Sequence, residues 1–188
     1  MKNVTRLVTA GVCLALCLIL PFLTGQIPAV GNMMLPMHLP VLLCGFLCGP
    51  IYGLGVGFLA PILRNLLFGM PPLMPTGAAM AFELAAYGAF SGLFYGLLPK
   101  KSIHLYTSLI GAMLGGRIVW GIVSFVLYRL LGNPFTVQIF LAGAFFNAVP
   151  GILCQLILIP PVVLALQKAG LFSASSAAVA KKRERRAV

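Results

Sequence analysis

The chain has 188 residues, of which 61% are hydrophobic and only 8% are charged. A soluble domain carries roughly 25% charged residues, so these side chains could not cover a surface in contact with water. The formal net charge of +11 comes largely from predicted helix ends and a basic tail, a pattern that indicates contact with anionic lipid and not nucleic-acid binding.

The composition therefore indicates an all-α integral membrane protein, because a bilayer-spanning segment must satisfy its own backbone groups. We predict six apolar helices, over residues 5–24, 37–48, 51–68, 76–98, 104–131 and 135–167. Crossing a bilayer takes about 20 helical residues. We therefore expect the second and third segments to form a short or tilted pair that meets at Gly49-Pro50.

Basic residues place both ends of the chain on one side of the membrane. Lys2 and Arg6 precede the first segment, Lys100 and Lys101 lie between the fourth and fifth, and five basic residues lie in the tail. The positive-inside rule makes that side the cytoplasm. We predict a six-helix transmembrane domain over 1–171 and a disordered basic tail over 172–188.

Acidic residues are too few for most catalytic chemistry. The chain has two, Glu83 and Glu184, and the second lies in the tail. Divalent-metal chemistry needs several carboxylate ligands, and paired-acid catalysis needs two acids at one site. We therefore expect no enzyme, no metal and no cofactor. Five cysteines lie in apolar runs without a C-x-x-C spacing, which favours packing, although i,i+4 pairs leave a thiolate site open.

Two ionisable residues lie deep in apolar segments, at Glu83 in the fourth and Arg117 in the fifth. Burying a charge in lipid costs several kcal/mol, so such residues usually face a polar pocket or pathway. At 1.5 Å per helical residue, they lie about 25 Å and 20 Å from the cytoplasmic ends of their helices, at compatible heights. Either they form a structural ion pair, or Glu83 orients Arg117 toward a ligand.

Other polar residues extend this candidate site. Trp120 follows Arg117 by three residues, and an arginine beside an aromatic ring suits a small polar molecule with an apolar body. Asn147 and Gln155 lie about two turns apart on the sixth segment and can share a face. They would line a cavity, or bond a neighbouring helix.

Arg64 and His38 are candidates with competing interpretations. Arg64 lies near the outer end of its segment, where it would face an outer cavity or anchor the helix at the interface. His38 begins the second segment, where a role in fixing the loop competes with a role in ligand binding.

Several motifs together resemble a known family. Segment one carries Gly11-x-x-x-Ala15, a small-residue face that lets another helix approach closely. The stretch PMHLPVLLCGFLCGPIYGLGVGFLAPILRNLLFG combines a short apolar run, a Gly-Pro turn and a glycine-rich helix. With six spans and both ends inside, residues 1 to about 170 resemble the substrate-binding S component of energy-coupling factor (ECF) vitamin transporters, in its pantothenate-like branch.

The resemblance implies a multi-pass protein of a prokaryotic cell membrane, surrounded by the lipid bilayer. It would capture a vitamin between segments four to six, under the loop 25–36, and dock through Gly11 and Ala15 on a coupling transmembrane subunit with two ATP-binding subunits. The sequence has no Walker A motif, so a partner would hydrolyse ATP.

The arginines of the candidate site, Arg117 and Arg64, favour pantothenate, because its one carboxylate can accept charge-assisted hydrogen bonds from them. Pyridoxine, hydroxymethylpyrimidine and riboflavin remain alternatives, as does a self-contained secondary transporter that uses Glu83 as its ion site. An intramembrane enzyme and a scaffold protein without a small-molecule ligand are the remaining alternative functions.

Overall fold

The computed structural model describes residues 3–24, 27, 33–99 and 102–168. Within these ranges every regular element is helical. The main helices are α1 (Asn3–Ile19), α3 (His38–Cys48), α4 (Pro50–Phe68), α5 (Ala78–Leu97), α6 (Ser102–Leu130) and α8 (Val149–Lys168). The shorter elements are the 3₁₀ turn η1 (Leu20–Thr24), the π-helical turns η2 (Leu73–Gly77) and η3 (Ala142–Phe146), and α7 (Val137–Leu141).

The predicted all-α membrane bundle is confirmed. Five apolar helical stretches are long enough to span a bilayer, and α3 is a sixth, shorter apolar helix. The five stretches are Asn3–Leu23, Pro50–Phe68, Leu73–Leu97, Ser102–Leu130 and Val137–Lys168. Their ends lie within about three residues of the predicted ones, because the lengths of the apolar runs set the lengths of the helices.

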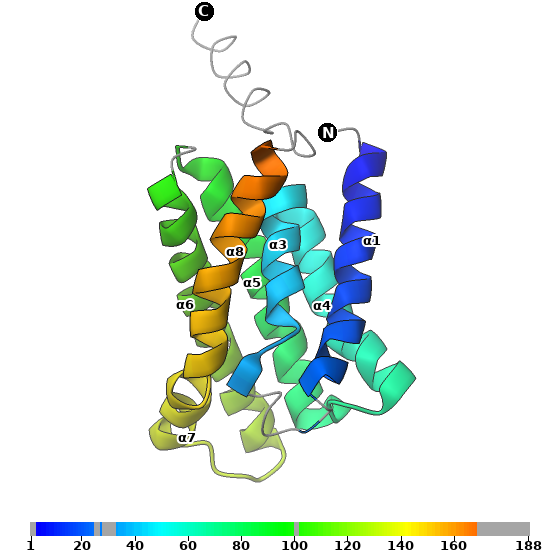
Figure 1. Ribbon diagram of the computed structural model, residues 1–188. Coiled ribbons are helices and arrows are strands. Elements are labelled where there is room, and N and C mark those ends of the chain that lie inside the picture. Colours follow the sequence, from blue (N-terminus) through cyan, green and yellow to red (C-terminus); the bar gives the residue numbers. More distant parts are fainter. Residues whose placement is uncertain (1–2, 25–26, 28–32, 100–101, 169–188) are drawn as a thin grey trace, which may run out of the picture.

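The start of α1, the end of α8 and the α5–α6 connection lie at one end of the bundle, at the top of Figure 1. Arg6 and Lys168 lie near that end, whereas Arg64 and Arg129 lie toward the other, so the side that faces the cytoplasm stays a prediction. The other basic groups used for the prediction, including the tail 172–188, lie outside the described residues.

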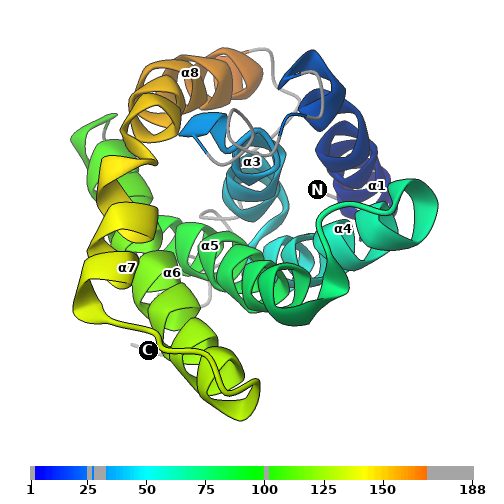
Figure 2. The ribbon, with the colours of Figure 1, turned by 90° about the horizontal axis from the view of Figure 1, so that it is seen from below.

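Helix α3 occupies the centre of the bundle, with α1, α4, α5, α6 and α8 arranged around it (Figure 2). Eight of its 11 residues are buried. At 1.5 Å per residue α3 is only about 16 Å long, roughly half the thickness of a bilayer core. Its first residue, His38, therefore lies inside the bundle and not at the membrane surface.

Glycines allow α3, α4 and α5 to pack backbone against backbone. A Cβ atom added at Gly88 of α5 would lie 2.1 Å from the Gly53 carbonyl oxygen of α4. One added at Gly57 would lie 2.2 Å from the Leu84 carbonyl oxygen. Small residues at such contacts let membrane helices approach closely, and these three helices form the close-packed part of the fold.

Candidate functional site

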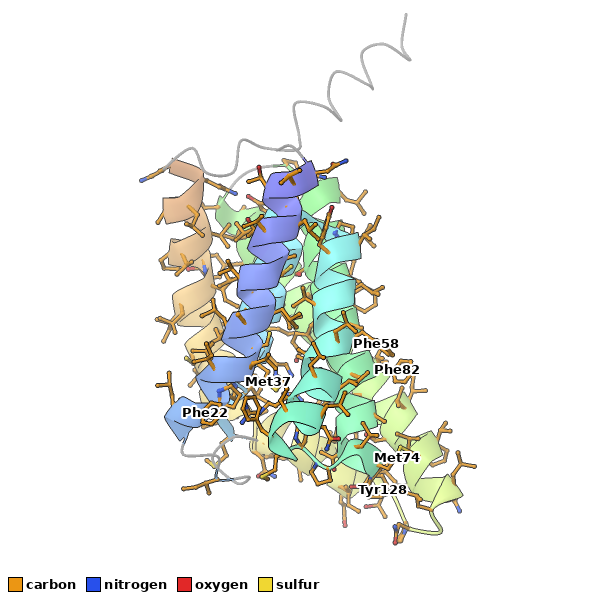
Figure 3. All side chains as sticks on the ribbon, turned by 90° about the vertical axis from the view of Figure 1, so that its right-hand side faces the viewer. Phe22, Met37, Phe58, Met74, Phe82 and Tyr128 are labelled. Carbon is orange, nitrogen blue, oxygen red and sulfur yellow. The ribbon has the colours of Figure 1, made fainter. Side chains whose placement is uncertain are left out.

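A cavity of about 500 Å³ lies at the start of α3 and is lined there by residues 35–38 together with the later parts of α4 and α6 and the first part of α5. This volume is within the range of pockets that hold small molecules. Its polar lining residues come from α3, α4, η2, α5, α6 and the turn after η3: His38, Arg64, Thr76, Glu83, Arg117 and Asn147. Figure 3 shows Met37 and Tyr128, which also line the cavity, in the lower part of the bundle.

Glu83 joins three helices at this cavity. Its Oε1 accepts a hydrogen bond from Arg117 Nη1 at 2.7 Å, and His38 Nε2 lies 3.3 Å from the same oxygen. All three residues are buried. The predicted compatible heights of Glu83 and Arg117 are thus matched by a direct ion pair. Because both residues also line the cavity, the pair does not exclude a role in binding a ligand.

Arg117 retains hydrogen-bonding capacity beyond this pair. Its Nε and Nη2 are buried and form no hydrogen bond of standard geometry among the described residues, and the buried Tyr87 hydroxyl interacts with the Arg117 guanidinium. A guanidinium group has five N–H donors, and buried donors are normally paired. An edge of Arg117 is thus left for an acceptor, and a carboxylate fits the planar arrangement of two N–H groups.

Arg64 brings a second positive charge to the cavity. Its Nη1 donates to the Leu18 carbonyl oxygen at 2.6 Å, and its guanidinium lies over the rings of Phe22 and Phe68, 5.2 and 5.4 Å from their centroids. These contacts tie the end of α1 and η1 to α4. They also explain how an arginine near the outer end of its helix is only 4% exposed.

The charges that line the cavity do not cancel. Arg64 and Arg117 each contribute a positive charge and Glu83 one negative charge, so one positive charge is in excess among the described lining residues. The excess charge is that of Arg64, which is held by the Leu18 carbonyl oxygen and two aromatic rings but by no carboxylate among the described residues. A ligand with a single negative charge would neutralise it, whereas a neutral or cationic ligand would not.

An aromatic cluster supports the part of the cavity wall that Trp120 and Tyr128 of α6 form. Trp120 stacks on Phe140, with ring centroids 6.1 Å apart, and meets the edge of Phe135 at 5.9 Å. The ring centroids of Tyr128 and Phe135 are 5.4 Å apart. A Cβ atom at Gly143 would lie 2.7 Å from Trp120, so glycine lets the indole pack against η3. The wall suits the apolar part of a small molecule.

The sequence-predicted site residues do not all meet. Arg117, Glu83, Trp120, Arg64, His38 and Asn147 all line the cavity. Gln155 is fully buried about two turns further along α8, outside the set of lining residues, and neither end of its amide has a partner among the described residues. Gly11 and Ala15 are exposed on the outer face of α1.

Other residues at the site were not singled out from the sequence. These are Thr76, Met80 and Tyr128, which line the cavity. Tyr87, an amphipathic aromatic that is evident in the fourth apolar segment, packs edge-on against His38 with centroids 4.9 Å apart. Threonine, methionine and tyrosine are ordinary residues of membrane helices, so their composition gives no signal. The one sequence feature that points to Thr76 and Tyr128 as cavity residues is their position near the uncharged outer loops.

The family model described as "ECF transporter, substrate-specific component" matches residues 5–163, most of the chain. The chain belongs to this family. It is therefore the substrate-specific membrane subunit of an ECF transporter and not an enzyme. As an S component it works with an ECF module of transmembrane and ATPase subunits and takes a small-molecule substrate. No curated protein and no solved structure was found to match it.

Proposed function

We propose that this S component captures a vitamin that carries one carboxylate, with pantothenate as the first choice. The observation that carries the proposal is the excess positive charge of the cavity, together with the unpartnered Nε and Nη2 of Arg117. Pyridoxine, hydroxymethylpyrimidine and riboflavin carry no carboxylate, so they would leave that charge without a partner.

In this proposal each wall of the cavity has its own role. Arg117 binds the carboxylate through two N–H groups, and Glu83 holds its guanidinium in place. Arg64 adds attraction for the anion, while Trp120 and Tyr128 contact the apolar part of the vitamin. Asn147 offers an amide that can donate or accept. Residues 1–171 would form the substrate-binding unit, and 172–188 lie outside the described residues.

Binding of pantothenate by the purified chain, without ATP, is the expected result of a ligand panel. The chain has one tryptophan, Trp120, and it lines the cavity. Pantothenate should therefore change the intrinsic fluorescence, and titration should give a single site. Pyridoxine, riboflavin, thiamine, biotin and folate serve as the comparison ligands.

A Trp120→Phe variant is the control for the signal: it should lose the fluorescence change but retain heat of binding in calorimetry. Preference for a vitamin without a carboxylate would contradict the charge argument. Binding of no vitamin at all would contradict the vitamin proposal itself.

We also propose that the outer face of α1 contacts the coupling transmembrane subunit. Gly11 and Ala15 are exposed one turn apart, and nothing lies within 4 Å of a Cβ atom added at Gly11. Gly11→Leu and Ala15→Leu should abolish vitamin uptake in cells that contain the coupling module, because a large side chain would separate the two helices. Vitamin binding by the purified variant should be unchanged.

Gly11→Ala is the matched control, since it keeps the surface small, and it should support normal uptake. Normal uptake by both leucine variants would mean that another face of the S component contacts the module.

A further inference from the structure

We propose that His38 determines specificity by accepting a hydrogen bond from the ligand, so that the substrate is a monocarboxylate that also carries a hydroxyl or N–H group. The inference rests on the proposed function and names the chemistry of its substrate more narrowly. It assigns the carboxylate to Arg117 and the hydrogen-bond donor of the ligand to His38 Nδ1.

The neighbour of Nε2 fixes where the imidazole proton lies. His38 Nε2 is 3.3 Å from Glu83 Oε1, and an ionised carboxylate oxygen only accepts hydrogen bonds. Arg117 Nη1 donates to the same oxygen at 2.7 Å, so Glu83 is the carboxylate of a direct carboxylate–guanidinium ion pair. Nε2 must therefore carry the hydrogen in this arrangement.

The charge balance keeps the ring neutral. Arg117 already compensates Glu83, and Arg64 adds a further positive charge to the cavity lining. A protonated His38 would bring a third positive charge to a buried site that holds one carboxylate. With the proton on Nε2 and the ring neutral, Nδ1 presents a lone pair and acts as an acceptor.

That acceptor has no hydrogen-bond partner in the part of the chain that the structure describes. His38 is 1% exposed, and its Nδ1 has no hydrogen-bond partner among the described residues. Tyr87 packs edge-on against the ring at an interplanar angle of 87°, which restricts its reorientation. Buried acceptors are normally paired. His38 lines the cavity, and Nδ1 itself is covered, so a donor group of the ligand would pair with Nδ1 once the ligand displaces the side chains that cover this atom.

The two binding groups are close enough for one small molecule. Arg117 Nη1 and His38 Nε2 contact the same oxygen atom, so the two side chains are neighbours in the wall of one cavity. The unpartnered atoms, Arg117 Nε and Nη2 and His38 Nδ1, belong to the same two planar groups, which places all of them within the span of one small molecule. Pantothenate has the required groups, a carboxylate together with two hydroxyls and an amide N–H.

Analogues of pantothenate test the inference. In one series each hydroxyl is replaced in turn by hydrogen, and in another the amide is N-methylated. One of these changes should lower the affinity of the parent chain about tenfold, because the Nδ1 acceptor is again left unpaired. His38→Phe should bind pantothenate about tenfold more weakly than the parent and should not distinguish that analogue from pantothenate.

His104→Asn is the matched control. His104 is the other of two histidines, lies near the start of α6 and does not line the cavity. This variant should discriminate among the ligands as the parent does. Equal affinity of the parent for pantothenate and every analogue would overturn the role of His38 and leave the vitamin proposal standing.

Nitrogen-15 NMR provides a test that needs neither a ligand nor a folded His38 variant. With labelled histidine, the parent spectrum contains two imidazoles, and the His104→Asn spectrum identifies His38. His38 should show a protonated Nε2 and an unprotonated Nδ1. A protonated Nδ1 would overturn the inference even if the chain binds pantothenate. Failure to bind pantothenate with the expected tautomer present would contradict the proposed vitamin alone.

Discussion

Arg117→Ala is expected to weaken pantothenate binding by one to two decades. The substitution removes charge-assisted hydrogen bonds, which contribute about 1.5–3 kcal/mol, and each 1.4 kcal/mol corresponds to about tenfold in affinity. Arg117→Lys should rescue only part of the loss, because an ammonium group lacks the planar pair of donors. Calorimetry with the purified variants measures the effect. Arg129→Ala, on the same helix and exposed, should bind like the parent.

A second pair of measurements separates binding from folding. Arg117→Ala also leaves Glu83 as a buried carboxylate without its ion pair, which typically costs about 3–5 kcal/mol of stability. The double variant Glu83→Gln, Arg117→Gln replaces the ion pair with two neutral amides and should recover most of that stability in thermal unfolding. If its binding stays lost, Arg117 is the carboxylate anchor. If it binds pantothenate like the parent, the anionic-ligand proposal is wrong.

Gly88→Ala is expected to destabilise the folded chain strongly although it adds only one methyl group. Its Cβ would lie 2.1 Å from the Gly53 carbonyl oxygen and 2.3 Å from the adjoining carbonyl carbon, so α4 and α5 would have to separate. Overpacking of this kind costs about 1–3 kcal/mol, and occasionally more. The measurement is the thermal midpoint of the purified protein, together with the amount of folded protein obtained.

Gly96→Ala is a control on the same helix, since nothing lies within 4 Å of a Cβ atom at Gly96. Replacing a helical glycine by alanine stabilises a helix by roughly 0.5–1 kcal/mol, so this variant should unfold at the parent temperature or slightly above it. If Gly88→Ala unfolds like Gly96→Ala, the backbones of α4 and α5 are not in contact at this point.

Much of the fold could be predicted from the sequence because a bilayer restricts the choice of structure. Apolar runs about 20 residues long must become helices, and Gly49-Pro50 marks the break between α3 and α4. The π-helical turn η3 could not be predicted in this way, because it lies within the continuous apolar stretch 137–168, where hydropathy does not distinguish an α-helical turn from a π-helical one. The turn η2 is different, since it overlaps the proline-rich segment before the fourth predicted helix, and its Met74 has extended, non-helical dihedral angles.

The candidate site could be predicted in part because charges in an apolar segment are conspicuous. Glu83 and Arg117 were paired by counting residues along straight helices. His38 was harder to place, since the start of a segment suggests a position at the membrane surface. Because α3 is short and central, its start lies at the depth of Glu83 instead. Gln155 shows the converse, since a shared helix face with Asn147 did not bring both residues to the cavity.

The unequal count of charges in the cavity also has an electrical consequence. Moving one elementary charge across a membrane involves about 2.3 kcal/mol for each 100 mV of potential. With Arg64, Arg117 and Glu83 in their ionised forms, the cavity lining carries one net positive charge, and a bound monoanion would neutralise it. In a transport cycle that moves this site across the bilayer, the voltage would then act on the empty carrier and not on the loaded one. An inside-negative potential would oppose the outward return of the empty site, so resetting and not delivery would be the voltage-sensitive step.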